Sequence, residues 1–274
     1  GMVDTLMLSS VNDQAVGALG TANTYIGIFI IMFSVISSGM VAVMTQNIGA
    51  GRPGVAYQAR QLGLAFNAVL GVIMSLFLSL GAGTILSGVG VADALMQPAR
   101  TYLQIVGGFC ILNALIPICS SYLRAFGFSK EPLYASIIGN VINFCLNAFF
   151  LFVLHKGVAG VATATVISRI INLVIVVLLG AVLVKAKQHP ERESNREVMG
   201  QIIRIGLPSA CETAIYNVSM TLVIRFLNQM DAQGLNVTAR SYTMQITNFS
   251  YCVGAALAQA NAIMTGWHIG AKEY

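Results

Sequence analysis

The sequence predicts an all-α membrane protein that crosses the bilayer several times. Of its 274 residues, 56% are hydrophobic and only 9% are charged, and the mean hydropathy is +0.77. A water-soluble domain carries about 25% charged residues, because its surface must be hydrated. Long uncharged stretches recur along the chain, and they are continuously apolar instead of alternating, which favours helices over barrel strands. The composition therefore excludes a soluble enzyme, a disordered chain and a nucleic-acid-binding protein.

The uncharged stretches are long enough for several membrane-spanning helices. A bilayer core about 30 Å thick needs roughly 20 apolar residues of helix. We expect these helices at about 15–46, 58–86, 94–124, 132–154, 158–185, 200–228 and 240–267. Residues 1–9 are predicted to be the end of a helix that precedes them, so the chain would hold about eight.

The positive charges lie mainly on one side of the predicted helices. Of the 15 Lys and Arg residues, ten belong to loops on that side, and five of these lie between Lys185 and Arg204. The positive-inside rule assigns this side to the cytoplasm. We expect the protein to lie in the inner membrane of a bacterial cell. We therefore predict an N-terminal lobe at 1–185, a cytoplasmic linker at 186–199 and the start of a C-terminal lobe at 200–274.

A weak internal repeat supports this division. Ile48-Gly49-Ala50 matches Ile269-Gly270-Ala271 at an offset of 221 residues, which aligns the second helix with the eighth. Six helices per repeat would give two parallel repeats and twelve helices, a plan that many transporters use. The second repeat stops after two of its six helices. We therefore expect a fragment that lacks the start of the first helix and the last four helices.

Several motifs, in order along the chain, resemble those of the multidrug and toxic compound extrusion (MATE) transporters. They are Val3–Ser9 at the end of the first helix, Thr45–Gly51 as the "Q-x-x-G-A-G" turn, Ser121–Gly127 at the fourth-helix exit, Asn143–Asn147 and Gly157–Ala162 in the fifth and sixth helices, and Ile205–Pro208 with Glu212 in the second lobe. The resemblance implies a monomeric exporter of small organic cations, driven by entry of protons or sodium ions and without a cofactor. Two lobes would enclose a central cleft in the lipid bilayer.

Two carboxylates, Asp4 and Glu212, are predicted to lie within the membrane. A charge there is costly and points to function by default. A carboxylate in this position can take up a proton or hold a cation, including sodium at Asp4. The alternatives are that Asp4 lies near the interface and stays hydrated, and that Glu212 accepts hydrogen bonds from backbone that Pro208 leaves unpaired.

Three asparagines, Asn140, Asn143 and Asn147, share one face of the fifth helix because of their spacing. This face would line a cavity or, alternatively, bond to another helix. The resemblance places Asn143 and Asn147 beside Asp4 and makes them, with Glu212, the coupling site. Many relatives have aspartate where this chain has Asn147, so Asp4 would be the one titratable group there. We expect the substrate cleft to include Asn140, Thr163, Thr165, Tyr25 and Tyr216.

Two other functions compete with export of cations. A flippase for lipid-linked oligosaccharides or lipid precursors would need several basic side chains in the cleft to bind pyrophosphate, and only Arg169 and Arg225 are candidates. A membrane-embedded enzyme is disfavoured, because the three histidines lie at loops or helix ends and no H-E-x-x-H or G-x-S-x-G motif occurs. The residue pattern also predicts no metal site apart from sodium at Asp4.

The charge pattern leads to a test of topology. In a cysteine-free background, the Ser194→Cys variant should react with an impermeant maleimide only from the cytoplasmic side, and Asn12→Cys only from outside. Labelling of intact cells and of inverted vesicles distinguishes the two sides. The reverse pattern would contradict the assignment of the linker to the cytoplasm.

Overall fold

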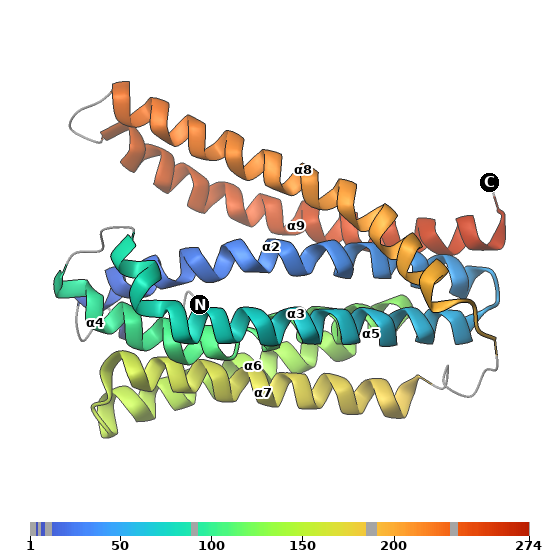
Figure 1. Ribbon diagram of the computed structural model, residues 1–274, viewed down its shortest axis with the longest axis horizontal. Helices are drawn as coiled ribbons and strands as arrows, with labels where there is room; N and C mark the ends of the chain where they lie inside the picture. Colours follow the sequence, from blue (N-terminus) through green and yellow to red (C-terminus); the bar gives the residue numbers. More distant parts are fainter. Residues whose placement is uncertain are drawn as a thin grey trace.

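The computed structural model describes residues 4, 7–8, 13–88, 93–184, 191–230 and 235–273, although parts of α2, α4, α8 and α9 are described by their backbone alone. Long helices dominate these ranges, which contain no strand (Figure 1). The elements are α2 (Asp13–Gly49), α3 (Pro53–Gly88), α4 (Asp93–Tyr102), the π-helix η1 (Leu103–Gly107), α5 (Ile111–Ala125), α6 (Lys130–Ala148), the π-helix η2 (Phe149–Val153), α7 (Gly157–Leu183), α8 (Asn195–Met230) and α9 (Leu235–Ala271). The predicted all-α class is confirmed.

The helix predicted at 94–124 is broken in the structure. The segments Leu95–Gly107 and Ile111–Ala125 meet at an angle of 43°. The break falls at Gly107 and Gly108, and a Cβ atom at Gly107 would press on the side chain of Leu78 in α3. Because Gly107 has no side chain, the bent segment can approach α3 closely. The hydrophobic pattern continues through the bend, so it did not reveal the break.

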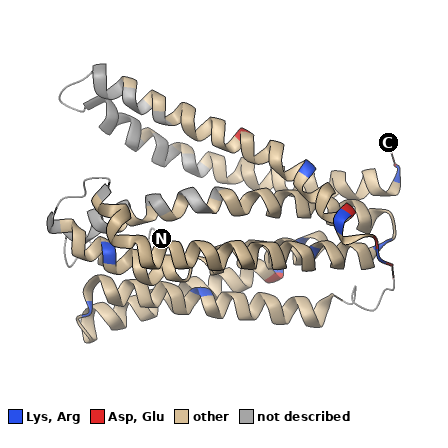
Figure 2. Ribbon diagram, viewed as in Figure 1, with Lys and Arg blue, Asp and Glu red and all other residues tan. Residues whose placement is uncertain are grey.

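The lengths and compositions of the described helices fit a polytopic membrane protein. The segments Pro53–Ser87, Lys130–Val153 and Gly157–Leu183 are long and apolar enough to span a bilayer, and the bent pair around Gly107 would make a fourth span. Charged residues are sparse along the helices and gather at the end where α2 meets α3 and α8 begins (Figure 2). An apolar belt with charges at its edge is the pattern that a bilayer requires.

Two hydrophobic clusters fill the lobe formed by α2 to α7. One surrounds the buried Leu78 and Tyr102, and the other surrounds Met40 and Tyr122 nearer the charged end. Between them, the buried Asn67 of α3 donates hydrogen bonds to the carbonyl oxygens of Phe33 (3.4 Å) and Ala114 (3.3 Å). A single amide thus joins α3 to both α2 and α5. These contacts hold the lobe together around α2.

Glycines bring α8 into backbone contact with α2. A Cβ atom on Gly206 would overlap the carbonyl oxygen of Val35, and one on Gly39 would overlap that of Ile202. Small residues allow membrane helices to approach in this way, where van der Waals packing replaces the hydrophobic effect. From this crossing, α8 diverges from α2 toward its Met230 end (Figure 1).

The crossing of α2 and α9 has approximate two-fold symmetry. Gly49 packs on the backbone of Trp267, and Gly270 packs on the backbone of Gln46. Members of both pairs, Gly49 with Gly270 and Gln46 with Trp267, are 221 positions apart. The two helices also run in the same direction (Figure 1). The sequence offset therefore corresponds to a symmetric contact, as expected for parallel repeats whose axis lies along the membrane normal.

The close glycine contacts predict that a larger side chain at these positions destabilises the fold. We expect Gly206→Ala to lower the free energy of unfolding by about 1–3 kcal/mol, because the new methyl group must displace the backbone of α2. Thermal unfolding of the detergent-solubilised protein measures this loss. Gly200→Ala on the same helix is the control, since no atom lies within 4 Å of its Cβ position. Equal stabilities of the two variants would contradict the tight crossing.

Candidate functional site

The structure places Asp4 against the asparagine face of α6. Asn147 Nδ2 donates a hydrogen bond of 2.7 Å to Asp4 Oδ1, and it lies 3.2 Å from Asn143 Oδ1. Asp4 is 2% exposed and Asn147 is fully buried. The carboxylate is thus held in a dry polar cluster and does not lie in a hydrated position at the interface. We call Asp4, Asn143 and Asn147 the aspartate cluster.

Local structure explains how the aspartate cluster assembles. Asn143 and Asn147 are four residues apart on α6, so one helix turn brings their amides together. Leu8, one turn after Asp4, is buried in the same hydrophobic cluster as Leu19 of α2. This packing anchors the segment that carries Asp4. One acceptor stays open: Asn147 Oδ1 is buried and has no hydrogen-bond donor in the described part of the chain.

Tyr102 and Arg169 extend the polar region beyond the aspartate cluster. Tyr102 is fully buried, and its hydroxyl donates a hydrogen bond of 3.4 Å to Asn23 Oδ1. The charges of both Asp4 and Arg169 act on this hydroxyl. The sequence did not point to Tyr102. Charged residues near it in the sequence suggested a position close to a loop and gave no sign that its side chain is buried.

A pocket of about 380 Å³ lies next to the asparagine face. It is lined by Ile30, Asn113, Ile116, Pro117, Ser136, Asn140, Arg169 and Asn172. Asn113 Nδ2 and Asn172 Oδ1 are buried and lack hydrogen-bond partners among the described residues. Unpaired buried amides favour the binding of a polar group. Of this lining, the sequence pointed to Asn140 as part of a cleft, whereas Asn113, Ser136 and Asn172 were missed.

The remaining predicted residues lie on helices other than α6. Thr163 and Thr165 donate their hydroxyl hydrogens to backbone oxygens of their own helix, at 2.8 Å and 2.9 Å. Glu212 and Tyr216 are exposed on α8, and Glu212 makes no hydrogen bond within the described ranges. The side chain of Tyr25 lies outside the described residues. No group of three or more metal-binding side chains occurs among the residues described.

The two ends of the α8–α9 pair are fastened to the first lobe at the charged end. Arg52 pairs with Glu193 at 2.5 Å, and Gln58 exchanges two hydrogen bonds with the backbone of Glu193. Trp267 Nε1 donates to the carbonyl oxygen of Ala125 at 3.0 Å. Together with the glycine crossings, these contacts close the molecule at this end.

Comparisons with known proteins agree with this architecture. Residues 1–149 match the MatE family model. An uncharacterized transporter of Bacillus subtilis, YisQ, is 32% identical over the whole chain and 61% of its own length. The probable multidrug resistance protein YoeA of Bacillus subtilis is 24% identical over 94% of the chain and 58% of its own length.

A solved structure described as MATE in the bent conformation has the same fold. Its TM-score is 0.89 at 19% identity, over 98% of this chain and 61% of that one. The chain thus spans about three-fifths of the length of the proteins it matches. None of these similarities favours the flippase alternative. Since the family model matches more than half of the sequence, the chain belongs to the MatE family, whose members are membrane transporters and not enzymes.

Proposed function

We propose that the whole protein is a secondary active multidrug exporter, which exchanges small organic cations for protons or sodium ions by alternating access of two lobes. The observation that carries this proposal is the buried aspartate cluster, in which the Asn147 amide donates hydrogen bonds to both Asp4 and Asn143. The relative YoeA, a probable multidrug resistance protein, supports the substrate class. The protein would act as a monomer in a bacterial inner membrane, with residues 186–199 in the cytoplasm.

The aspartate cluster offers oxygen atoms that suit a proton or a hard cation. The possible ligands are the Asp4 carboxylate, Asn143 Oδ1 and Asn147 Oδ1, and the last of these has no hydrogen-bond donor among the described residues. Asp4 and Asn147 are almost completely shielded from solvent. Burial of an ionised carboxylate is costly, so a bound proton or sodium ion would neutralise Asp4 favourably. This uptake is the coupling event in the proposed cycle.

Competition for negative charge would link the ion to the drug. A cationic compound binds best while Asp4 is ionised, and neutralisation of Asp4 lowers the affinity for that compound. Thermodynamic reciprocity then requires that the bound compound oppose ion entry by the same factor. Glu212 would add negative charge from the second lobe. The pocket at Arg169 is positive, so it suits neutral or acidic parts of a substrate instead of its cationic centre.

The glycine crossings supply a place for the lobes to rock. In the structure, α8 and α9 are joined to α2 at the charged end, which we assign to the cytoplasm. This arrangement corresponds to a form closed toward the cytoplasm. Separation of these contacts, including the Arg52–Glu193 pair, would open the opposite form, as rocking of parallel repeats requires.

Removal of the Asp4 charge should abolish coupling without loss of structure. Asn can keep the hydrogen-bonded geometry to Asn147, so Asp4→Asn should insert normally, yet gradient-driven transport should fall at least about 100-fold, as expected when a group essential to coupling is lost. The measurement is efflux of a fluorescent organic cation from vesicles, with proton and sodium gradients imposed separately.

The control for this test is Glu273→Gln, which makes the same carboxylate-to-amide change at an exposed site paired with His268. It should leave transport unchanged. Efflux by Asp4→Asn close to that of the parent protein would remove Asp4 from the mechanism.

Loss of the Glu212 charge should weaken substrate binding instead of coupling. A loss of about 1.4 kcal/mol of attraction corresponds to about tenfold weaker binding. We therefore expect Glu212→Gln to bind an organic cation about that much more weakly, with its dependence on the driving ion retained. Equilibrium binding of the fluorescent cation measures the effect, and Glu197→Gln, exposed in the first turn of the same helix, is the control. Unchanged affinity would show that Glu212 does not contact the substrate.

A further inference from the structure

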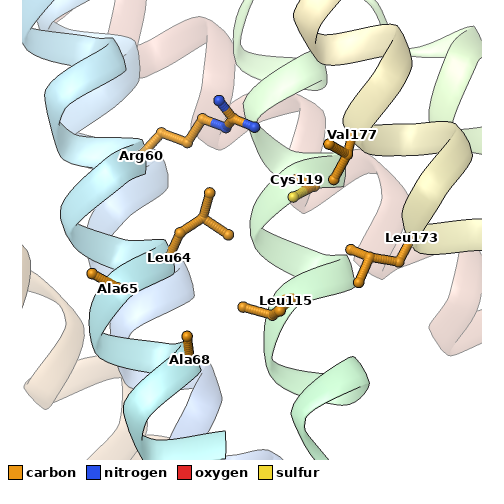
Figure 3. Close-up of a pocket in the computed structure, with 8 residues that line it drawn as sticks. All are labelled: Arg60, Leu64, Ala65, Ala68, Leu115, Cys119, Leu173 and Val177. Atoms are coloured by element: carbon orange, nitrogen blue, oxygen red, sulfur yellow. The ribbon is translucent and has the colours of Figure 1, made fainter. Parts of the chain in front are cut away.

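An apolar groove runs between α3 and α7, with α5 as its floor (Figure 3). Its volume is about 380 Å³. The lining consists of Arg60, Leu64, Ala65, Ala68, Leu115, Cys119, Leu173 and Val177. The residues recur at intervals of about four along each helix, so the groove follows the helix axes. Arg60 is its one charged lining residue and extends across one end toward α5 (Figure 3).

The guanidinium of Arg60 has aromatic neighbours but no counter-charge among the described residues. Its Cζ lies 4.6 Å from the ring centre of Tyr122 and 5.9 Å from that of Tyr57. Its Nε is buried and has no hydrogen-bond partner, and no described carboxylate forms an ion pair with it. Arg52, nearby in sequence, is by contrast paired with Glu193. A partly buried guanidinium without an anion is unfavourable, so Arg60 favours the binding of one.

The position of Arg60 matches the level of lipid headgroups. It follows Pro53, the first residue of α3, by seven positions, or about 10 Å along the helix. Leu64 and Ala68 lie one and two turns deeper in the apolar belt. The helix surfaces beside the groove are exposed and apolar, as shown by Val69 (63% exposed) on α3 and Leu178 (58%) on α7. The groove therefore opens toward lipid, with its charge at the headgroup level.

We propose that this groove binds an anionic phospholipid of the cytoplasmic leaflet. The phosphate would lie on the Arg60 guanidinium, which Tyr57 and Tyr122 hold in place, and one acyl chain would occupy the space between α3 and α7. Basic pockets between membrane helices on the cytoplasmic side are suited to such headgroups, and guanidinium groups bind phosphate by charge-assisted hydrogen bonds. A soluble anion would leave the apolar walls uncovered, and a zwitterionic lipid would bring an extra positive charge beside Arg60.

Electron paramagnetic resonance of spin-labelled lipids tests the proposal on the whole protein. The protein is reconstituted in phosphatidylcholine vesicles that contain a trace of nitroxide-labelled phosphatidylglycerol or, separately, labelled phosphatidylcholine. We expect an immobilised component that favours phosphatidylglycerol by about fivefold, the factor that one basic residue near the surface provides. Arg60→Gln should remove this preference, and Arg60→Lys should keep most of it.

Two further variants make the result specific to the groove. Ala68→Phe fills the part that would hold the acyl chain, so it should reduce the immobilised component while Arg60 is intact. Arg52→Gln removes an exposed, paired charge near the same surface and should leave the lipid preference unchanged. The proposal is overturned if the parent protein shows no preference, or if Arg60→Gln and Ala68→Phe both retain the preference of the parent. Transport need not change in either case, so this outcome is independent of the proposed export function.

Discussion

A polar group inside a bilayer must find its partner within the protein, because hydrocarbon offers neither hydrogen bonds nor hydration. This constraint explains why the few polar side chains at membrane depth are gathered in clusters. Asp4 is held by Asn147, and Asn67 joins three helices through two backbone oxygens. The groups that remain unpaired, such as Asn147 Oδ1, therefore mark places where a ligand or an ion can supply the missing partner.

The same constraint shapes the contact between the lobes. Helices in lipid gain little from burying apolar side chains, so their backbones must approach closely to gain packing energy. Gly39, Gly49, Gly206 and Gly270 allow this approach along α2. A contact built from backbone and small residues has few interlocking side chains, and this property suits the rocking motion that we propose.

Charges of opposite sign divide the first lobe into regions with different chemistry. Asp4 gives the aspartate cluster a negative charge, whereas Arg169 gives the neighbouring pocket a positive one, and Tyr102 lies under the influence of both. Arg60 places a further positive charge at the lipid-facing groove. One bundle of helices thus carries separate regions of opposite charge, to which our proposals assign an ion, a substrate and a lipid.

The sequence by itself determined the fold class and the approximate helix limits, and it predicted two carboxylates, Asp4 and Glu212, at membrane depth. It could do so because a bilayer imposes long uncharged helices, and any charge within them is conspicuous. Helix spacing also placed Asn143 and Asn147 on one face. The sequence could not show the break at Gly107, since the apolar pattern continues through it.

Only the tertiary structure decided which polar groups meet. It brought Asp4 to Asn147 across 143 positions of sequence, placed Arg169 and Asn172 in one pocket, and left Arg60 without a carboxylate partner among the described residues. The hydroxyls of Thr163 and Thr165 turned out to bond their own helix. The physical reason is that periodicity specifies the face of a helix on which a side chain lies, whereas the neighbour of that face depends on how the helices pack.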